Sequence, residues 1–334
     1  MQEAGADSRT ESTSPSRGPR HAFSPWRHRL GVTTAFATLG LIFVGGLVTS
    51  TGSGLAVPDW PLSYGMLMPP MVGGVFYEHG HRLAASLIGL LTLGLVVWTA
   101  RTEARRGVRR LAWACLLAVV LQGLLGGLTV IYLLPLAVSV THACLAQTFF
   151  CLVITLAYAT SREWLSTTAP GESDVAGLRK AAPLLAGIVY LQLLVGALMR
   201  HMGAGLAIPD FPLAFGRLLP PLTDAAVAVH FAHRLGAILV LAAALYCVSR
   251  AWWMADRRFL RGSLGILALV VAQISLGGLT VLSGRLVFPA TLHVATGAAT
   301  LGASWLLTLR VYRALGRDGG VAVTASLGEP AAAA

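Results

Sequence analysis

The sequence has little charge, few acidic residues and few cysteines. Of its 334 residues, 12% are charged and only 14 are Asp or Glu, whereas 55% are hydrophobic. Because an average domain is about one quarter charged, this composition excludes an ordinary soluble protein. The cysteines, at 115, 144, 151 and 247, all lie in apolar stretches. We therefore expect small buried side chains at these positions rather than a disulfide framework.

Long apolar runs fill most of the chain. A helix needs ~20 apolar residues to cross a bilayer, and eight stretches meet this requirement. They are 31–50, 81–100, 110–131, 137–160, 181–200, 232–250, 262–283 and 290–312. The ends, 1–30 and 313–334, are predicted to be disordered tails, and 161–180 a linker. The predicted fold class is all-α integral membrane, with eight transmembrane helices.

The net charge of +11 does not indicate nucleic-acid binding, because the basic residues occupy one set of connections. Of the 25 Lys and Arg residues, 20 lie in the N-terminal tail, in the segments 101–110, 162–180 and 250–261, and at the C-terminal end from Arg310 onward. This is the positive-inside pattern of membrane proteins. It predicts that both termini and the linker are cytoplasmic.

Residues 31–160 and 181–312 form an internal repeat. Gly-Leu-Ala-Val-Pro-Asp-Trp-Pro-Leu at 54–62 corresponds to Gly-Leu-Ala-Ile-Pro-Asp-Phe-Pro-Leu at 205–213. Each half has four predicted crossings, so both halves enter the membrane with the same orientation. The sequence therefore predicts two parallel-repeat four-helix bundles side by side.

Two long outer loops, 51–80 and 201–231, connect the first and second predicted helices of each half. Pro on both sides of Asp59 and Asp210 stiffens them. We expect a lid over each bundle. The alternative is a structural loop in which the Asp caps a short helix.

Four histidines recur in the repeat. His81 and His233 lie at the outer end of the second predicted helix of each half, and His142 and His293 near the outer end of the fourth. An imidazole within an apolar helix is costly unless something binds it. Two imidazoles facing each other across a bundle suit a porphyrin iron, whereas structural zinc would want four ligands. The alternative for any one of them is an interhelical hydrogen bond.

The residues beside these histidines suggest further roles. Arg82 and Arg234 directly follow His81 and His233. Each is placed to donate hydrogen bonds to a haem propionate. The alternative is an arginine that extends its charged end to the membrane boundary. Three residues before the histidine the first half has Glu78 and the second has His230, so an acid/base candidate exists in the first half alone.

Three other histidines, His79, His201 and His230, do not recur between the halves. We expect them to be loop or interfacial residues rather than ligands.

These motifs together resemble those of the bacterial and mitochondrial haem A synthases, across essentially all of 31–312. The resemblance is carried by Gly-Leu-Ala-Val-Pro-Asp-Trp-Pro at 54–61, Glu-x-x-His-Arg at 78–82, and Gly-Gly-Leu-Thr at 126–129 followed by His142, with their second-half copies. Some bacterial members carry a cysteine pair in the first outer loop. This chain has no cysteine there, which excludes a thiol-based step through that loop.

The resemblance implies oxidation of a ring methyl of haem O to the formyl group of haem A, which terminal oxidases use. It implies a resident haem b on His233 and His293. It associates His81 and His142 with the substrate haem and makes Glu78 important for activity. A bacterial plasma-membrane location follows, with the lipid bilayer, a haem O synthase, an electron donor and a second copy of the chain as candidate partners.

Two other classes compete with this interpretation. A di-haem membrane cytochrome that only transfers electrons predicts symmetric histidine sites and no need for Glu78. A transporter predicts polar residues at mid-membrane, whereas the informative residues here lie near the outer face.

Overall fold

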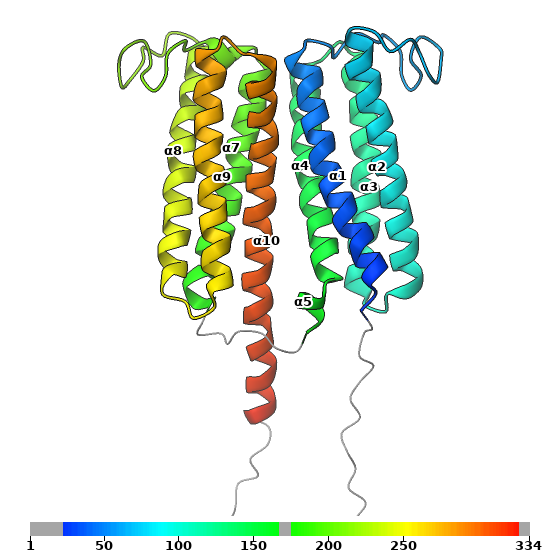
Figure 1. Ribbon diagram of the computed structural model, residues 1–334, viewed down its shortest axis with the longest axis vertical. Coiled ribbons are helices and arrows are strands. Elements are labelled where there is room, and N and C mark those ends of the chain that lie inside the picture. Colours follow the sequence, from blue (N-terminus) through cyan, green and yellow to red (C-terminus); the bar gives the residue numbers. More distant parts are fainter. Residues whose placement is uncertain (1–22, 167–174, 327–334) are drawn as a thin grey trace, which may run out of the picture.

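The structure is a computed structural model that describes residues 23–166 and 175–326, with side chains described as far as 315. Its long helices, shown in Figure 1, are α1 (Pro25–Ser50), α2 (Gly74–Thr102), α3 (Arg106–Ile131), α4 (Leu136–Ala159), α7 (Ala181–His201), α8 (Ala225–Trp252), α9 (Arg257–Leu282) and α10 (Val287–Ser326). Three short helices, α5 (Arg162–Leu165), η1 (Ala176–Leu178) and η2 (Ala204–Leu206), lie in the connections.

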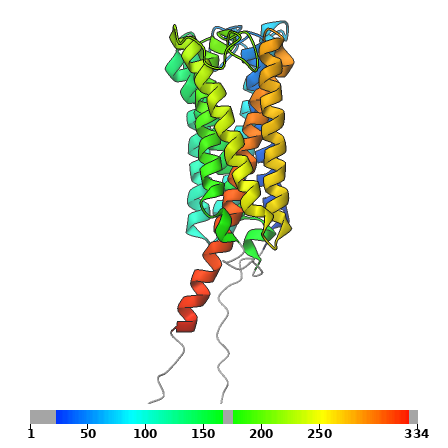
Figure 2. The same cartoon turned by 90° about the vertical axis from the view of Figure 1, so that its left-hand side faces the viewer.

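Eight helices of the described chain are long and apolar enough to cross a membrane. They coincide with the eight predicted stretches, which confirms the prediction of an all-α, multi-pass membrane protein. α10 is unusual in continuing to Ser326. Figures 1 and 2 show it extending beyond the ends of the other helices.

The long helices form two groups in the order of the repeat. α1 to α4 contact one another in sequence and close through α1 and α4, and α7 to α10 do the same through α7 and α10. The groups meet where α1 packs on α10 and where α4 packs on α7 and α10 (Figure 1). These contacts support the predicted pair of repeat bundles, which remains a proposal.

α1 begins and α10 ends at one end of the molecule, and the long connections 51–73 and 202–224 lie at the other (Figure 1). We call these ends the terminal end and the loop end. The two connections are the first and second outer loops.

Several predicted boundaries were wrong. α2 and α8 each begin seven residues earlier than predicted, because the polar residues before the apolar runs are accommodated inside the helices. The outer loops are correspondingly shorter, so His79 and His230 lie on helices and are buried rather than in loops. α1 starts at Pro25 within the predicted tail, and α10 continues past 313. Predictions for 1–22, 167–174 and 327–334 fall outside the described residues.

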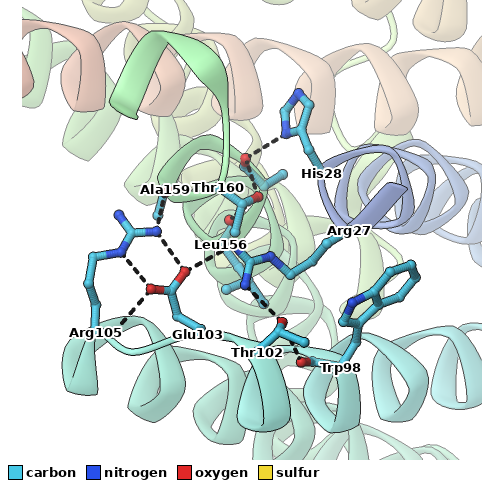
Figure 3. Close-up of polar contacts among 10 residues, drawn as sticks. Arg27, His28, Trp98, Thr102, Glu103, Arg105, Leu156, Ala159 and Thr160 are labelled. Atoms are coloured by element: carbon cyan, nitrogen blue, oxygen red, sulfur yellow. Dashed lines mark hydrogen bonds and ion pairs between the residues drawn. The ribbon is translucent and has the colours of Figure 1, made fainter. Parts of the chain in front are cut away.

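A polar network joins the helices of the first half at the terminal end (Figure 3). Arg27 of α1 forms an ion pair of 3.0 Å with Glu103, in the turn between α2 and α3, and both side chains are buried. Arg105 pairs with the same carboxylate at 2.8 Å and donates to the carbonyl of Ala159 in α4. One carboxylate therefore links four helices.

The second half uses apolar packing at the same place. The residues 151 positions after Arg27 and Glu103 are Leu178 and Met254, and both belong to the buried core of that half. The halves thus share helix positions but not the chemistry that fixes their ends.

Candidate functional site

Each of the four repeated histidines packs the edge of its ring against a glycine of the preceding long helix. The pairs are His81 with Gly45, His142 with Gly126, His233 with Gly196, and His293 with Gly277. A Cβ on these glycines would lie 2.9–3.2 Å from the imidazole Cε1, so a larger residue would displace the ring. All four rings are therefore closely packed, and each lies between two helices near the loop end.

The second-half histidines face each other. The ring centroids of His233 and His293 are 6.1 Å apart, with an angle of 72° between the ring planes. Two imidazoles that bind one metal ion through bonds of about 2 Å each place their centroids roughly 6 Å apart. This pair therefore fits a haem iron between the rings. No such ring contact joins His81 and His142 in the described part of the chain.

Hydrogen bonds hold both second-half rings at Nδ1. His293 Nδ1 lies 3.0 Å from the backbone carbonyl of Gln273. His233 Nδ1 lies 3.1 Å from the side-chain amide of Gln192, which also donates to the carbonyl of His233 at 2.7 Å. The carbonyl of Gln273 can accept from Nδ1–H of His293, which fixes that ring and leaves its Nε2 for a metal, whereas the Gln192 amide N–H makes Nδ1 of His233 an acceptor.

The first-half rings lack this support. His81 Nδ1 and His142 Nδ1 are buried and have no hydrogen-bond partner among the described residues. The Gln122 amide donates to the carbonyl of His142 at 3.0 Å and lies 3.3 Å from its Nε2, and the equivalent Gln273 amide lies 3.4 Å from Nε2 of His293. The predicted ligands are therefore present in both halves, but in different hydrogen-bonding environments.

Glu78 is 4% exposed and lies one turn from His81 and Arg82. One carboxylate oxygen accepts from the Arg82 guanidinium at 2.6 Å, and the other accepts from the backbone N–H of Val57 at 2.9 Å. Its charge is thus balanced by an adjacent cation, and the carboxylate attaches α2 to the first outer loop.

Arg82 and Arg234 hold the outer loops in the same way. Arg82 donates to the carbonyls of Asp59 and Leu62, both at 2.7 Å. Arg234 donates to the carbonyls of Asp210 and Leu213, also at 2.7 Å. The expected contact of these arginines with haem propionates remains a prediction.

His230 occupies in the second half the place of Glu78. Its Nδ1 lies 3.3 Å from the backbone N–H of Ile208, the counterpart of Val57. The position is therefore a loop anchor in both halves, and only the first half has an anionic anchor.

His79 has a defined partner that sequence reasoning missed. Its Nδ1 lies 2.8 Å from the hydroxyl of Ser63 in the first outer loop. The corresponding residues of the second half are Phe231 and Ala214, which pack in a small apolar cluster. The sequence indicates this contact, because Ser63 and His79 are both replaced in the second half, by Ala214 and Phe231.

The aspartates of the outer loops close turns and cap no helix. The Asp59 carboxylate accepts from the backbone N–H groups of Tyr64 and Gly65, at 2.6 and 2.8 Å. Asp210 makes the same two bonds, at 2.7 and 2.8 Å, to Phe215 and Gly216. The hydrogen bond from the glycine N–H is the main cause that lowers the pKa of each carboxyl group.

Each loop also places an aromatic ring over the histidine site. The Trp60 ring packs on Gly127, where a Cβ would lie 2.6 Å from the ring. Phe211 packs on Gly278 in the same way, at 2.7 Å. These glycines directly follow Gly126 and Gly277, so each Gly-Gly pair accepts a histidine ring and a loop ring side by side. This geometry supports the predicted lids.

Arg200 lies between the halves and was not singled out in the sequence. Its guanidinium donates to the carbonyl of Gly46 at 3.0 Å and to the hydroxyl of Ser50 at 2.7 Å, both in α1. No ion pair involves it within the described ranges. Because no carboxylate of the described residues pairs with it, the Arg200 guanidinium is available to an anionic group of a ligand.

Comparison with known proteins agrees with this arrangement. The model of the family COX15-CtaA, described as cytochrome oxidase assembly protein, matches residues 28–305. The chain is 36% identical over 257 residues to the heme A synthase of Symbiobacterium thermophilum, covering 74% of this chain and 82% of that protein. It is 31% identical over 297 residues to the heme A synthase of Shouchella clausii, covering 85% and 94%.

Proposed function

Because the chain belongs to the COX15-CtaA family of cytochrome oxidase assembly proteins, we propose that it is a haem A synthase. It is an enzyme of haem biosynthesis that oxidises a ring methyl of haem O to a formyl group. The observation that carries the assignment of its chemical site is the Glu78–Arg82 ion pair beside His81, which the second half lacks.

The substrate haem belongs to the first half in this proposal. His81 and His142 would hold its iron, and Glu78 is the group able to accept or return a proton at its carboxylate. Arg82 orients that carboxylate through a hydrogen bond of 2.6 Å. The first outer loop, held by Glu78 and Arg82, covers the site with Trp60 and restricts access of water.

A resident haem b belongs to the second half. His233 and His293 would hold it, which their spacing and the contact of His293 Nδ1 with the Gln273 carbonyl support. When bound, such a haem supplies one-electron transfer. The chain's own residues orient the two rings and cover them with Phe211.

The distribution of charge supports a bacterial plasma-membrane location with the terminal end in the cytoplasm. The five remaining basic residues all lie at or near the loop end; they are Arg82, Arg200, Arg217, Arg234 and Arg285. The lipid bilayer is the first partner, and haem O would enter from it. A haem O synthase, an electron donor and a second copy of the chain remain candidate partners.

The test replaces Glu78 by Gln, which keeps the shape and removes the charge. Expressed with a supply of haem O, Glu78→Gln should lose haem A formation at least ~100-fold, the scale of general acid–base catalysis. Its haem b content should stay at the wild-type level. The matched control is His230→Gln, at the same position of the second half, which should still form haem A.

Pigment extraction followed by chromatography measures both quantities. Haem A formation unchanged in Glu78→Gln would remove Glu78 from the chemistry. Wild-type protein that binds haem b but never yields haem A would favour the di-haem cytochrome instead.

A further inference from the structure

A groove at the terminal end of the first half is lined mainly by arginines. It lies where α2 meets α3, has a volume of about 500 Å³, and is lined by Ala100, Arg106, Arg109, Arg110 and Trp113. We propose that this groove binds the phosphate of an anionic phospholipid, whose acyl chains lie on the exposed apolar surface of α3. The proposal is independent of the catalytic function, because it uses neither the four repeated histidines nor a haem.

The three arginines of the groove have no counter-ion among the described residues. None of them forms an ion pair within the described ranges. The nearest acid in the sequence is Glu103, and its carboxylate is already paired with Arg27 at 3.0 Å and with Arg105 at 2.8 Å (Figure 3). Three uncompensated cations therefore share one groove, which favours an anion from outside the protein.

The depth of the groove suits the headgroup of a lipid. Ala100 lies in the last turn of α2 and Arg106 is the first residue of α3, so the groove is at the end of two membrane-spanning helices. Trp113 follows about two turns into α3 and is 56% exposed. Tryptophan is enriched at the boundary between membrane and water, where lipid headgroups lie.

The surface next to the groove can hold the acyl chains. Leu117 and Leu121 follow Trp113 on α3 at intervals of four residues, and both are exposed. Residues four apart lie on the same face of a helix, so an apolar stripe runs from the groove towards the middle of the membrane. A basic groove at the end of transmembrane helices is the form of site that binds anionic lipid headgroups, and guanidinium groups bind phosphate oxygens in pairs.

The second half has different chemistry at the same place. The residues 151 positions after Arg109 and Trp113 are Leu260 and Leu264. Arg257, the counterpart of Arg106, donates to the backbone carbonyl of Trp252 at 3.3 Å. The cluster of three free arginines beside a tryptophan is therefore a feature of the first half, and the second half supplies a matched control.

Native mass spectrometry of the purified full-length protein, titrated with phosphatidylglycerol in detergent, tests the proposal. Arg106→Gln with Arg110→Gln should weaken the tightest phosphatidylglycerol binding by about 25-fold, since each arginine near an anionic headgroup contributes roughly 5-fold. The control is Arg257→Gln with Arg261→Gln, which removes two charges at the equivalent positions of the second half. It should leave this binding unchanged.

A second variant tests the groove without the same two arginines. Arg109→Leu with Trp113→Leu copies the second half and should also lose the tightest binding. Circular dichroism of each variant confirms that the helices are intact. Two further titrations of the wild type identify the ligand. Phosphatidylcholine, which has acyl chains but no net charge, should bind at least ~10-fold more weakly, and an excess of inorganic phosphate should not displace phosphatidylglycerol.

Equal weakening in the first-half variant and the control would show that the lipid responds to total charge, and would overturn the proposal. Equal binding of the two lipids by the wild type would overturn it as well. Displacement of the lipid by inorganic phosphate would assign the groove to a free anion instead.

Discussion

At the scale of the residue, the paired glycines at 126–127 and 277–278 explain how the site is packed. In each pair the first glycine contacts the histidine ring and the second contacts the aromatic ring of the outer loop. Both contacts need a surface without a Cβ, since an added methyl group would overlap the rings. The sequence marks these glycines as part of the repeat, but only the structure shows that they accept different partners.

This packing predicts that Gly277→Ala disturbs the resident site. The new Cβ would lie 3.0 Å from His293 Cε1, so the ring must shift away from its position. We expect a cost of about 1–3 kcal/mol in stability and a clear loss of bound haem b. Haem content and the optical spectrum of purified protein measure the effect.

Gly265→Ala is the control for this change. Gly265 lies on the same helix and has open space where a Cβ would be added. A spectrum of Gly277→Ala indistinguishable from that of the control would contradict the role of the glycine.

At the scale of the element, the two halves fix their terminal ends by different means. Glu103 forms ion pairs with Arg27 of α1 and with Arg105, which in turn donates to the Ala159 carbonyl of α4, whereas Leu178 and Met254 belong to an apolar core. Breaking a buried ion pair costs far more than replacing the whole pair by apolar residues. The first half therefore fixes its terminal end by buried ion pairs, and the second half fixes its terminal end by apolar packing.

Glu103→Gln should therefore destabilise the protein by about 3–5 kcal/mol, because Arg27 is left buried without its counter-ion. The double variant Arg27→Leu with Glu103→Met, which copies the second half, should recover most of this loss. Unfolding of both variants in detergent gives the comparison. A double variant less stable than Glu103→Gln would show that the network cannot be replaced by apolar packing.

The same carboxylate predicts a dependence on pH. Hydrogen bonds from Arg105 are the main cause that lowers the pKa of Glu103 to about 2, from an ordinary value of 4.5. Because this pKa is lower in the folded than in the unfolded state, ionised Glu103 adds to the free energy of unfolding. The contribution is full above about pH 4.5 and is lost as the pH falls towards about 2. The stability difference between wild type and Glu103→Gln should narrow over this range, as unfolding at several pH values would measure. A constant difference would contradict the assignment.

At the scale of the whole molecule, hydrogen bonds at several levels join the two halves. Arg200 reaches α1 near the loop end, Tyr190 meets Thr148 at 2.9 Å, and Trp305 donates to Thr155 at 2.9 Å. Lipid tails are as apolar as the helix surfaces, so polar contacts and close packing have to supply the specificity of this interface.

A double-mutant cycle between Trp305→Phe and Thr155→Val measures one of these contacts. Each single variant should lose about 0.5–1.5 kcal/mol, and the coupling should be of similar size, because each removes the same hydrogen bond. Trp253→Phe, at an exposed residue, is the control. Additive effects of the two changes would show that the bond does not stabilise the interface.

The sequence by itself determined the eight spanning helices, the repeat and the positions of the four histidines. These features depend on the length of apolar runs and on matching residues at a constant offset, which need no knowledge of neighbouring helices. The same information did not find the starts of α2 and α8. Their first two turns carry the polar residues Glu78, His79 and His230, which are stable in a helix because the outer loops bind them.

Only the tertiary structure decided how the two histidine pairs differ. Whether a ring nitrogen has a partner depends on side chains and carbonyls of other helices, and on ring positions that no sequence offset reveals. The rings of His233 and His293 lie 6.1 Å apart, and no such ring contact joins His81 and His142 among the described residues. The position of a histidine can be read from the sequence, but its hydrogen bonds depend on how the helices pack around it.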